Sequence, residues 1–372
     1  MGGTERQWVE EAFASNWIVP LGPNVNEFEH RLEKYLGSDG KRVVALSSGT
    51  AAIHLGLLMA GVERGDEVIC QSMTFSASAN PIVYLGASPV FIDSERATWN
   101  MSPRALERAI VDRKKVTGRY PAAIVAVHLY GMPACMDEIM EVASGYGIPV
   151  VEDAAEALGS EYKGRKCGTI GLYGTLSFNG NKIITTSGGG ALVGPDEATA
   201  KRVMFYATQA REDRPYYYHE KIGYNYRMSN VCAGIGCGQM DVLESHLARR
   251  RAIHALYREA FSGSELVTVH DNPSADYDSN YWLSTVTFGV GVKRSPDEIR
   301  VAMDSTGIET RLLWRPMHMQ PVFKDCPFYT DDDTAAPVDS GLFDRGLCLP
   351  SGSSLDDNDI ARVVDTLKTS LL

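Results

Sequence analysis

The sequence predicts an α/β protein with a mostly parallel sheet covered by helices. Two observations lead to this prediction. Short apolar runs alternate with helical stretches from residue 43 onward, and one later run ends in two carboxylates, Glu152 and Asp153. This βαβ order is typical of parallel sheets, which place ligands at the carboxyl ends of their strands. Because 372 residues exceed what one hydrophobic core usually serves, we expect a large domain over 1–245 and a smaller α+β domain over 246–372.

The elements follow one another at regular intervals. Two amphipathic helices, 4–16 and 24–36, open the chain and are separated by a Pro/Gly segment. The apolar strands expected after them cover 43–46, 67–70, 89–92 and 122–127, with helices at 50–60, 76–86, 103–113 and 135–146. Farther along we expect a helix over 196–206, one long helix over 229–261, a strand over 281–289 and a helix from Pro296.

Composition excludes several classes of function. The net charge of −11 argues against non-specific binding to nucleic acid or to an anionic membrane. The seven cysteines are scattered without a CxxC pair, which fits reduced thiols better than a disulfide framework or a zinc site. No signal peptide and no apolar run of membrane-spanning length is present. We therefore expect a soluble, cytoplasmic protein without a metal site.

A lysine and an aspartate suggest the chemistry. The apolar run 148–151 leads to Asp153, and a second run at 176–178 leads through a Gly/Asn turn to Lys182 and the glycines 188–190. Alone, a lysine in a turn is usually solvated and a strand-end aspartate is often a helix cap. Together they form the arrangement that a pyridoxal phosphate enzyme needs. The lysine amine condenses with the cofactor aldehyde, and the aspartate keeps the pyridine nitrogen protonated.

The segments VVEDAAEALGS and SFNGNKIITTSGGG resemble the signature of the DegT/StrS family of sugar-nucleotide aminotransferases, which are pyridoxal phosphate enzymes of fold-type I (aspartate aminotransferase-like). The resemblance extends from SNWIVPLGPNVNEFE to GLCLPSG and includes ATQARED and GYNYRMSN. Within the family, the chain resembles the bacillosamine-pathway branch. That branch aminates C4 of UDP-4-keto-6-deoxy-N-acetylglucosamine.

The resemblance implies which residues hold the cofactor. The turn at 47–51 joins a strand to a helix, where backbone N–H groups suit a phosphate, although such a turn is also an ordinary helix cap. By resemblance, Gly49 and Thr50 form the phosphate cradle, Ser177 is the other phosphate ligand, and Phe75 stacks on the pyridine ring. An aromatic residue at this place in a strand end more often packs in a core.

Glu156 departs from the family pattern. It lies three residues after Asp153, where family members often carry an amide or an imidazole. If it faces the cofactor phenolate, two anions repel each other unless a proton is shared. We therefore expect a raised pKa for Glu156 and a contact with the cofactor oxygen or with the amino donor. The segment 187–190 also lacks the acid of the commoner family text TTGEGG.

A polar, aromatic loop at 223–228 is by itself a connector or an interface segment. The resemblance implies that it crosses to a neighbouring subunit, where Asn225 reaches the other phosphate site and Tyr226 and Arg227 reach the substrate. We therefore expect a homodimer with shared active sites.

A segment near the C-terminus matches the family's substrate-facing part of the small domain. Its substrate-binding residues would be Trp314, Arg315 and His318, although a surface loop with a buried tryptophan is equally consistent with the residues. His128, which ends another strand, is expected to be a core histidine rather than an acid or a base.

The expected reaction is a ping-pong transamination with L-glutamate as the donor and the UDP-linked 4-keto sugar as the acceptor. A dTDP- or GDP-linked ketone would use the same cofactor residues. A dehydratase of this fold needs a histidine in place of Lys182, and a non-catalytic binding protein would not need the lysine, the aspartate and the phosphate loop. The UDP and C4 assignments depend on the resemblance alone.

Overall fold

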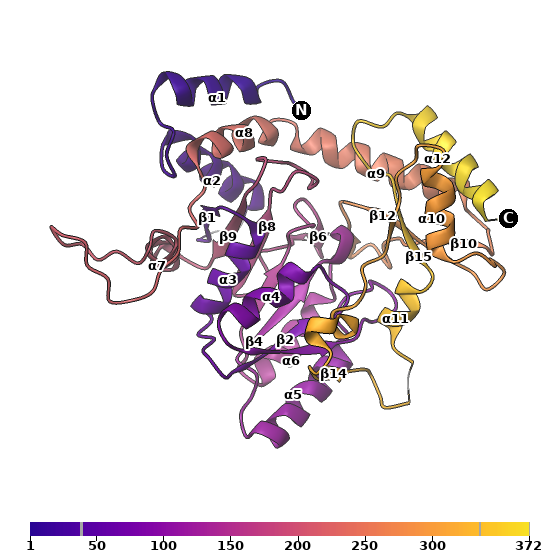
Figure 1. Ribbon diagram of the computed structural model, residues 1–372, viewed down its shortest axis with the longest axis horizontal. Helices are drawn as coiled ribbons and strands as arrows, with labels where there is room; N and C mark the ends of the chain where they lie inside the picture. The colour runs from indigo at the N-terminus through magenta and orange to yellow at the C-terminus, as the bar shows by residue number, and fades with distance from the viewer. Residues whose placement is uncertain (38–39, 335, 372) are drawn as a thin grey trace.

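The computed structural model describes residues 1–37, 40–334 and 336–371. Its centre is an eight-stranded sheet with helices on both faces, and a smaller antiparallel sheet lies to one side (Figure 1). This arrangement confirms the predicted α/β architecture with a mostly parallel sheet.

The large sheet has the order β1-β9-β8-β5-β4-β2-β3-β14, in which only β9 is antiparallel to its neighbours. Its edge strand β14 comes from the C-terminal part of the chain, so that part also contributes to the large sheet. The strands are β1 (Arg42–Leu46), β2 (Glu67–Gln71), β3 (Ser88–Ile92), β4 (Ala123–Val127), β5 (Val150–Asp153), β8 (Tyr173–Ser177), β9 (Gly190–Gly194) and β14 (Phe328–Tyr329).

Successive side chains of a central strand pack against different helix layers. On β2, Val68 and Cys70 pack in the cluster that contains α3, whereas Ile69 packs with α5 and α6. This alternation is the two-residue period of a strand buried on both faces. The helices of this part are α1 (Glu5–Ala14), α2 (Pro23–Leu36), α3 (Gly49–Met59), α4 (Ser76–Tyr84), α5 (Pro103–Thr117), α6 (Met136–Gly145) and α7 (Glu197–Ala207).

The single helix predicted over 229–261 is wrong. The structure contains α8 (Asn230–Met240) and α9 (Leu243–Ala260), separated by a tight turn at Asp241 and Val242. At this turn the Asp241 carboxylate accepts hydrogen bonds from Thr4, which precedes α1, at 2.8 Å and from Arg31 of α2 at 2.7 Å. Apolar periodicity continues through the turn, so the pattern alone does not reveal it.

The remaining elements form the smaller part of the molecule. A four-stranded antiparallel sheet, in the order β10-β12-β15-β13, packs against α9, α10 and α12 around one apolar cluster. The strand and helix predicted near 281–289 and Pro296 are confirmed as β12 and α10. The bounds are β10 (Val267–Val269), β12 (Ser284–Phe288), β13 (Arg311–Leu312), β15 (Gly346–Leu349), α10 (Pro296–Asp304), α11 (Val338–Phe343) and α12 (Asp357–Ser370). A further small sheet contains β6 (Glu161–Tyr162), β7 (Arg165–Lys166) and β11 (Tyr277–Asp278).

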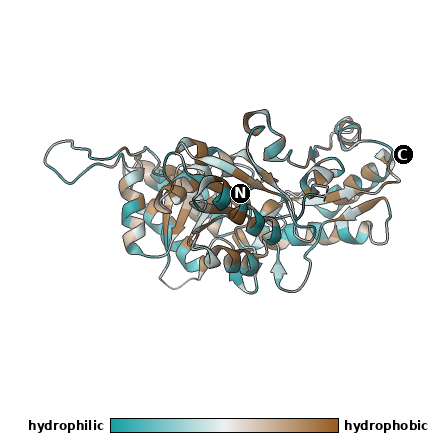
Figure 2. Ribbon diagram, turned by 90° about the horizontal axis from the view of Figure 1, so that it is seen from below, coloured by the Kyte–Doolittle hydropathy of each residue, from teal (hydrophilic) through white to brown (hydrophobic). Residues whose placement is uncertain are grey.

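The segment 211–222 projects from the body of the molecule as an extended, mostly hydrophilic loop (Figure 2). In the part of the chain that the structure describes, no helix combines the length and apolar character needed to cross a membrane. Within the same residues, no group of three or more His, Cys, Asp or Glu side chains gathers in a way that could hold a metal ion.

Candidate active site

The two carboxylates at the end of β5 have different surroundings, because neighbouring side chains of a strand point to opposite faces. Glu152 is fully buried and accepts backbone N–H groups of Gly168 at 2.8 Å and Gly171 at 2.5 Å, which shapes the turn before β8. It also lies 2.9 Å from Nε2 of the buried His128, whose Nδ1 accepts the N–H of Ala134. His128 is therefore a core histidine, as predicted, and Glu152 is structural.

Asp153 points into a cavity and is positioned by a chain of hydroxyl groups. The Ser78 hydroxyl donates to Asp153 Oδ2 at 2.6 Å, and Thr74 in turn donates to Ser78 at 2.6 Å. The N–H of Ala155 binds Oδ1 at 3.2 Å. Both carboxylate oxygens thus accept hydrogen bonds, which fix the orientation of the side chain.

Lys182 and Glu156 form a buried pair beside Asp153. Lys182 Nζ donates to Glu156 Oε1 at 3.1 Å, and the N–H of Tyr130 donates to Oε2 at 2.8 Å. Burial raises the pKa of Glu156, the Lys182 ammonium opposes this effect, and Asp153 adds to it; the net result is a pKa of about 7. The direction agrees with the expectation from the sequence, but the main cause is burial, and the expected contact with the cofactor oxygen or the donor stays a prediction.

The turn that the sequence resemblance assigns to a phosphate lies where α3 begins. Ser48 caps the helix by accepting the N–H of Ala51 at 3.0 Å, and the first N–H groups of a helix have no partners within it. The backbones approach closely here, because a Cβ on Gly49 would lie 3.0 Å from Ser177 Cβ, and one on Gly190 would lie 2.3 Å from the Ser48 carbonyl carbon. Glycine is therefore needed at 190 to seat β9 against this turn.

These groups surround one cavity of about 750 Å³ between the large sheet and the small one. Its wall includes the predicted residues Gly49, Thr50, Phe75, Asp153, Glu156, Ser177, Lys182 and Trp314. Phe75 is half exposed and lies 5.5 Å from Trp314 between ring centroids, at the side of the cavity. The cavity thus unites a lysine, an arginine, three carboxylates, three aromatic side chains and a helix N-terminus, a place that favours anions.

Comparisons with known proteins agree with this geometry. The pattern of the DegT/DnrJ/EryC1/StrS aminotransferase family matches residues 1–368. EpsN of Bacillus subtilis (strain 168), named as a pyridoxal phosphate-dependent aminotransferase, is 50% identical over 367 residues, which are 99% of this chain and 93% of EpsN. The chain belongs to this family. It is therefore a pyridoxal phosphate-dependent sugar aminotransferase.

Two further relatives extend the comparison. The GDP-perosamine synthase of Escherichia coli O157:H7 is 36% identical over 365 residues, covering 98% of this chain and 95% of that protein. The PLP form of the sugar aminotransferase Spr1654 of Streptococcus pneumoniae superposes with a TM-score of 0.87 at 27% identity, covering 99% and 96% of the two chains. The fold class predicted from the sequence is thereby confirmed.

The residues of the cavity fit pyridoxal phosphate. The helix N-terminus, Thr50 and Ser177 offer donors to a phosphate, and Asp153 offers a carboxylate to a protonated ring nitrogen. Lys182 supplies the primary amine within the same wall. This donor set matches the cofactor in both charge and chemistry.

Other predicted site residues lie outside the cavity of their own chain. Arg227 is buried, donates to Glu29 at 2.6 Å and to the carbonyl of Ala45 at 2.7 Å, and so ties the loop to α2 and β1. Tyr226 meets His54 Nδ1 through its hydroxyl at 3.2 Å, and Asn225 is exposed. Their predicted roles in a partner's site stay predictions.

Arg315 and His318 also do not line the cavity, unlike Trp314. Arg315 is exposed, and its carbonyl accepts from Gln320. His318 lies 2.7 Å from the Ser72 hydroxyl through Nδ1 and stacks on Phe328, and burial lowers its pKa to about 4. Within this chain His318 therefore contacts Ser72, which follows β2, and Phe328 of β14, and it does not line the cavity that contains Lys182.

Sequence reasoning missed Trp282. Its ring centroid lies 4.0 Å from Lys182 Nζ, and its indole N–H donates to the carbonyl of Asn181 at 2.7 Å. The backbone that presents it is fixed by the buried Asn280, which binds the carbonyl of Glu156 at 2.8 Å. The alternating pattern at 281–289 placed Trp282 in a strand, whereas β12 begins only at Ser284.

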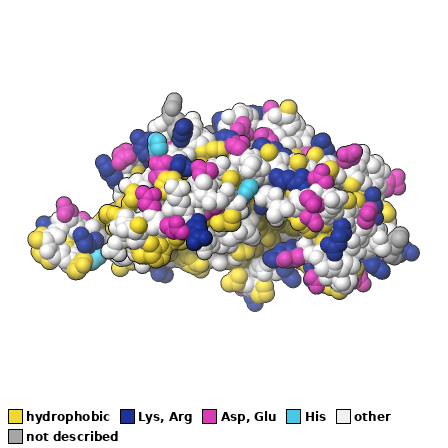
Figure 3. Space-filling view, turned by 90° about the horizontal axis from the view of Figure 1, so that it is seen from above, with side chains coloured by type: hydrophobic (Ala, Val, Ile, Leu, Met, Phe, Trp, Pro, Cys, Tyr) yellow, Lys and Arg dark blue, Asp and Glu magenta, His cyan; other side chains and the backbone are white. Residues whose placement is uncertain are grey.

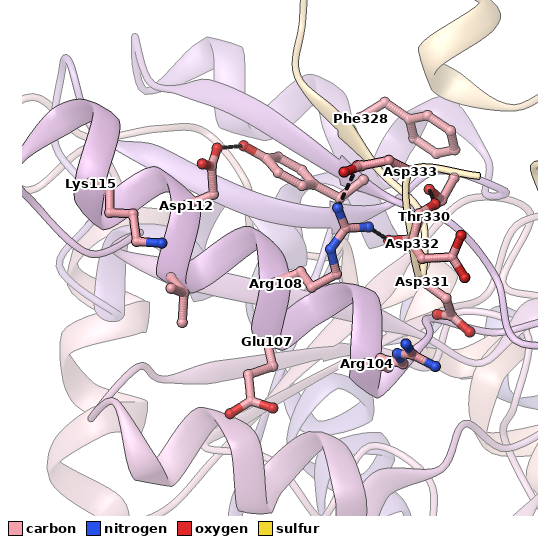
Figure 4. A pocket seen from close by; sticks show the side chains of 12 residues that line it. Arg104, Glu107, Arg108, Asp112, Lys115, Phe328, Thr330, Asp331, Asp332 and Asp333 are labelled. Carbon is pink, nitrogen blue, oxygen red and sulfur yellow. Dashed lines mark hydrogen bonds and ion pairs between the residues drawn. The ribbon is translucent and has the colours of Figure 1, made fainter. Parts of the chain in front are cut away.

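A second cleft, about 850 Å³, lies between α5 and the segment 328–333 (Figure 4). Arg108 crosses it to the carbonyl of Thr330 and to Asp333, and the Tyr329 hydroxyl donates to Asp112 at 2.5 Å. None of the predicted site residues lines this cleft.

Proposed function

We propose that the enzyme transfers the amino group of L-glutamate to C4 of UDP-4-keto-6-deoxy-N-acetylglucosamine, giving UDP-4-amino-4,6-dideoxy-N-acetylglucosamine. The observation that carries the transaminase assignment is the convergence of Lys182, Asp153 and Glu156 on one cavity wall. The choice of sugar is supported by the resemblance of the SFNGNKIITTSGGG segment to the bacillosamine-pathway branch.

Within this proposal each residue has a role. Bound pyridoxal phosphate supplies an aldehyde and an electron-withdrawing ring. Lys182 would hold the cofactor through its amine, and its Nζ, when free, would take the proton from the donor Cα and return it. Asp153 keeps the ring nitrogen protonated. Glu156 holds a proton next to Lys182 Nζ and contacts the cofactor oxygen or the donor.

Other residues of the cavity wall would hold the rest of the cofactor. Gly49, Thr50 and Ser177 bind the phosphate, and Phe75 stacks on the ring. Trp314 faces the sugar substrate from the small domain, for which we propose the range 246–372 against 1–245 for the large domain.

We also propose a homodimer in which Asn225, Tyr226 and Arg227 approach the partner's site. The projecting loop 211–222 supports this, since it exposes Tyr216, Tyr217 and Ile222, and hydrophobic side chains gather on this loop and beside its base (Figure 3). Such exposed apolar patches mark association surfaces. We further propose a cytoplasmic location, because all seven cysteines are free thiols.

A GDP-linked 4-keto sugar is the second candidate acceptor, favoured by the 36% identity with GDP-perosamine synthase. The deciding experiment incubates the enzyme and L-glutamate with the UDP-, GDP- or dTDP-linked 4-keto-6-deoxy sugar and measures product mass. We expect the mass of the 4-amino sugar with the UDP-linked N-acetyl substrate. Turnover of only the GDP- or dTDP-linked ketone would refute the UDP assignment but not the aminotransferase class.

A further inference from the structure

The segment 313–318 runs from β13 of the small sheet to the carboxyl edge of the large sheet. Its backbone is hydrogen-bonded to residues just beyond the ends of two parallel strands. The N–H of Met317 donates to the carbonyl of Ser72, which follows β2, at 2.8 Å. The N–H of Trp314 donates to the phenolic oxygen of Tyr130, which follows β4, at 2.8 Å. The segment therefore bridges the small sheet and the sheet edge that carries the site.

Tyr130 also contacts the acid beside the lysine. Its own N–H donates to Glu156 Oε2 at 2.8 Å, and Glu156 Oε1 accepts from Lys182 Nζ at 3.1 Å. The ring of Tyr130 is buried and lies 5.0 Å from the Trp314 ring between centroids. One residue thus joins Trp314, which lines the cavity, to the buried pair of Lys182 and Glu156.

The backbone of Tyr130 has a conformation that tyrosine rarely adopts. Its φ of 56° and ψ of 15° lie in the left-handed region, which glycine and asparagine enter at lower cost. Such outliers persist only where the surrounding structure enforces them, and they gather at active sites. Gly131 follows, also with a positive φ, and a Cβ there would collide with Asn280 Oδ1. This turn is therefore fitted closely against the segment that presents Trp282.

We infer that Tyr130 is a positioning residue that sets the distance between the Lys182–Glu156 pair and the cavity wall at Trp314. Because its amide is fixed to Glu156, the phenolic oxygen has a defined place from which to hold the Trp314 backbone. Phenylalanine would keep the ring and the amide but would remove the acceptor of the Trp314 N–H. The inference rests on the proposed function, in which Trp314 faces the sugar.

Hydrogen–deuterium exchange of the holoenzyme tests this contact without any substrate. In Tyr130→Phe we expect the Trp314 amide to exchange about 5- to 50-fold faster, since it has lost its acceptor, while amides of α12 exchange as in wild type. The matched control is Tyr173→Phe. Tyr173 is a buried tyrosine of β8 whose hydroxyl donates to the Met59 carbonyl at 3.3 Å, and it does not line the cavity. This control should leave the Trp314 amide unchanged. Unchanged exchange at Trp314 in Tyr130→Phe, or equal acceleration in α12, overturns the inference.

Calorimetric titration of the holoenzyme with UDP-N-acetylglucosamine, which lacks the ketone and is not aminated, measures the effect on the substrate side. We expect Tyr130→Phe to weaken its binding about 3- to 10-fold. Trp314→Leu should weaken it further, and the double variant should bind as Trp314→Leu does, because Tyr130 acts through Trp314. Losses that add in the double variant would mean that Tyr130 acts elsewhere, which contradicts the inference.

The donor half-reaction, followed in a single turnover with L-glutamate, separates positioning from damage at the lysine. It should change by less than about threefold in Tyr130→Phe, because the backbone N–H still holds Glu156 beside Lys182. A loss as large as the loss of sugar-nucleotide affinity would refute the positioning role. If wild type does not bind the UDP-sugar, the UDP assignment fails, whereas hydrogen exchange needs no sugar and still decides the inference.

Discussion

The pKa of Glu156 leads to a quantitative prediction for the substitution Glu156→Gln. Burial and Asp153 raise this pKa from an ordinary value of 4.5 to about 7, against the opposing effect of Lys182. Between these two pH values the folded protein keeps a proton that the unfolded chain has lost, so stability falls as the pH rises. A shift of this size corresponds to about 3 kcal/mol. Glutamine has a similar shape and does not titrate, so the variant should not show this loss.

The measurement is urea unfolding of the cofactor-free protein at pH 4.5 and pH 8, at one protomer concentration because association contributes to stability. Wild type should lose about 3 kcal/mol more than Glu156→Gln over this interval. Glu309→Gln, at an exposed carboxylate, should follow wild type. If wild type and Glu156→Gln lose stability equally, Glu156 is ionised throughout, and the proposed proton-holding role is refuted.

Three further substitutions test other parts of the site. Lys182→Ala should lower turnover by at least about 10²- to 10⁴-fold and abolish covalent trapping of the cofactor by borohydride; labelling of another side chain would contradict the assignment. Gly190→Ala should destabilise the protein by about 1–3 kcal/mol, since the added Cβ would meet the Ser48 backbone. The same substitution should weaken cofactor affinity in a fluorescence titration, and unchanged affinity would refute the close packing. Arg227→Met should cost about 3–5 kcal/mol by leaving Glu29 unpaired, with partial recovery in the double variant with Glu29→Gln. An unchanged stability with a raised KM for the sugar would instead favour a direct role of Arg227 at the substrate.

Much of the fold was predictable because its elements are signalled locally. The strands that end at Leu46, Val127 and Asp153 are apolar runs followed by helical stretches, and this order requires parallel pairing. The break at Asp241 was not predictable from periodicity, because the side chains that bind Asp241, Thr4 and Arg31, lie 237 and 210 residues earlier in the chain.

The candidate site divides in the same way. Spacing and motif placed Lys182, Asp153 and the turn at 47–51 on one sheet edge, because carboxyl ends of parallel strands meet there. Two contacts had no local signal. One is the contact of Trp282 with Lys182, in which the indole also binds Asn181, 101 residues earlier in the chain. The other is the hydrogen bond from Arg227 to Glu29, 198 residues earlier.

By itself, the sequence determined the α/β architecture, the cofactor chemistry and the lysine and aspartate that we assign to it. Only the tertiary structure decided that Glu156 pairs with Lys182, that Arg227 and His318 bind Glu29 and Ser72 of their own chain, and that Thr310 and Arg311 face the cavity. The physical reason is that periodicity and turn chemistry act over a few residues. Charge pairing and burial, in contrast, depend on segments that meet only after the two sheets have packed.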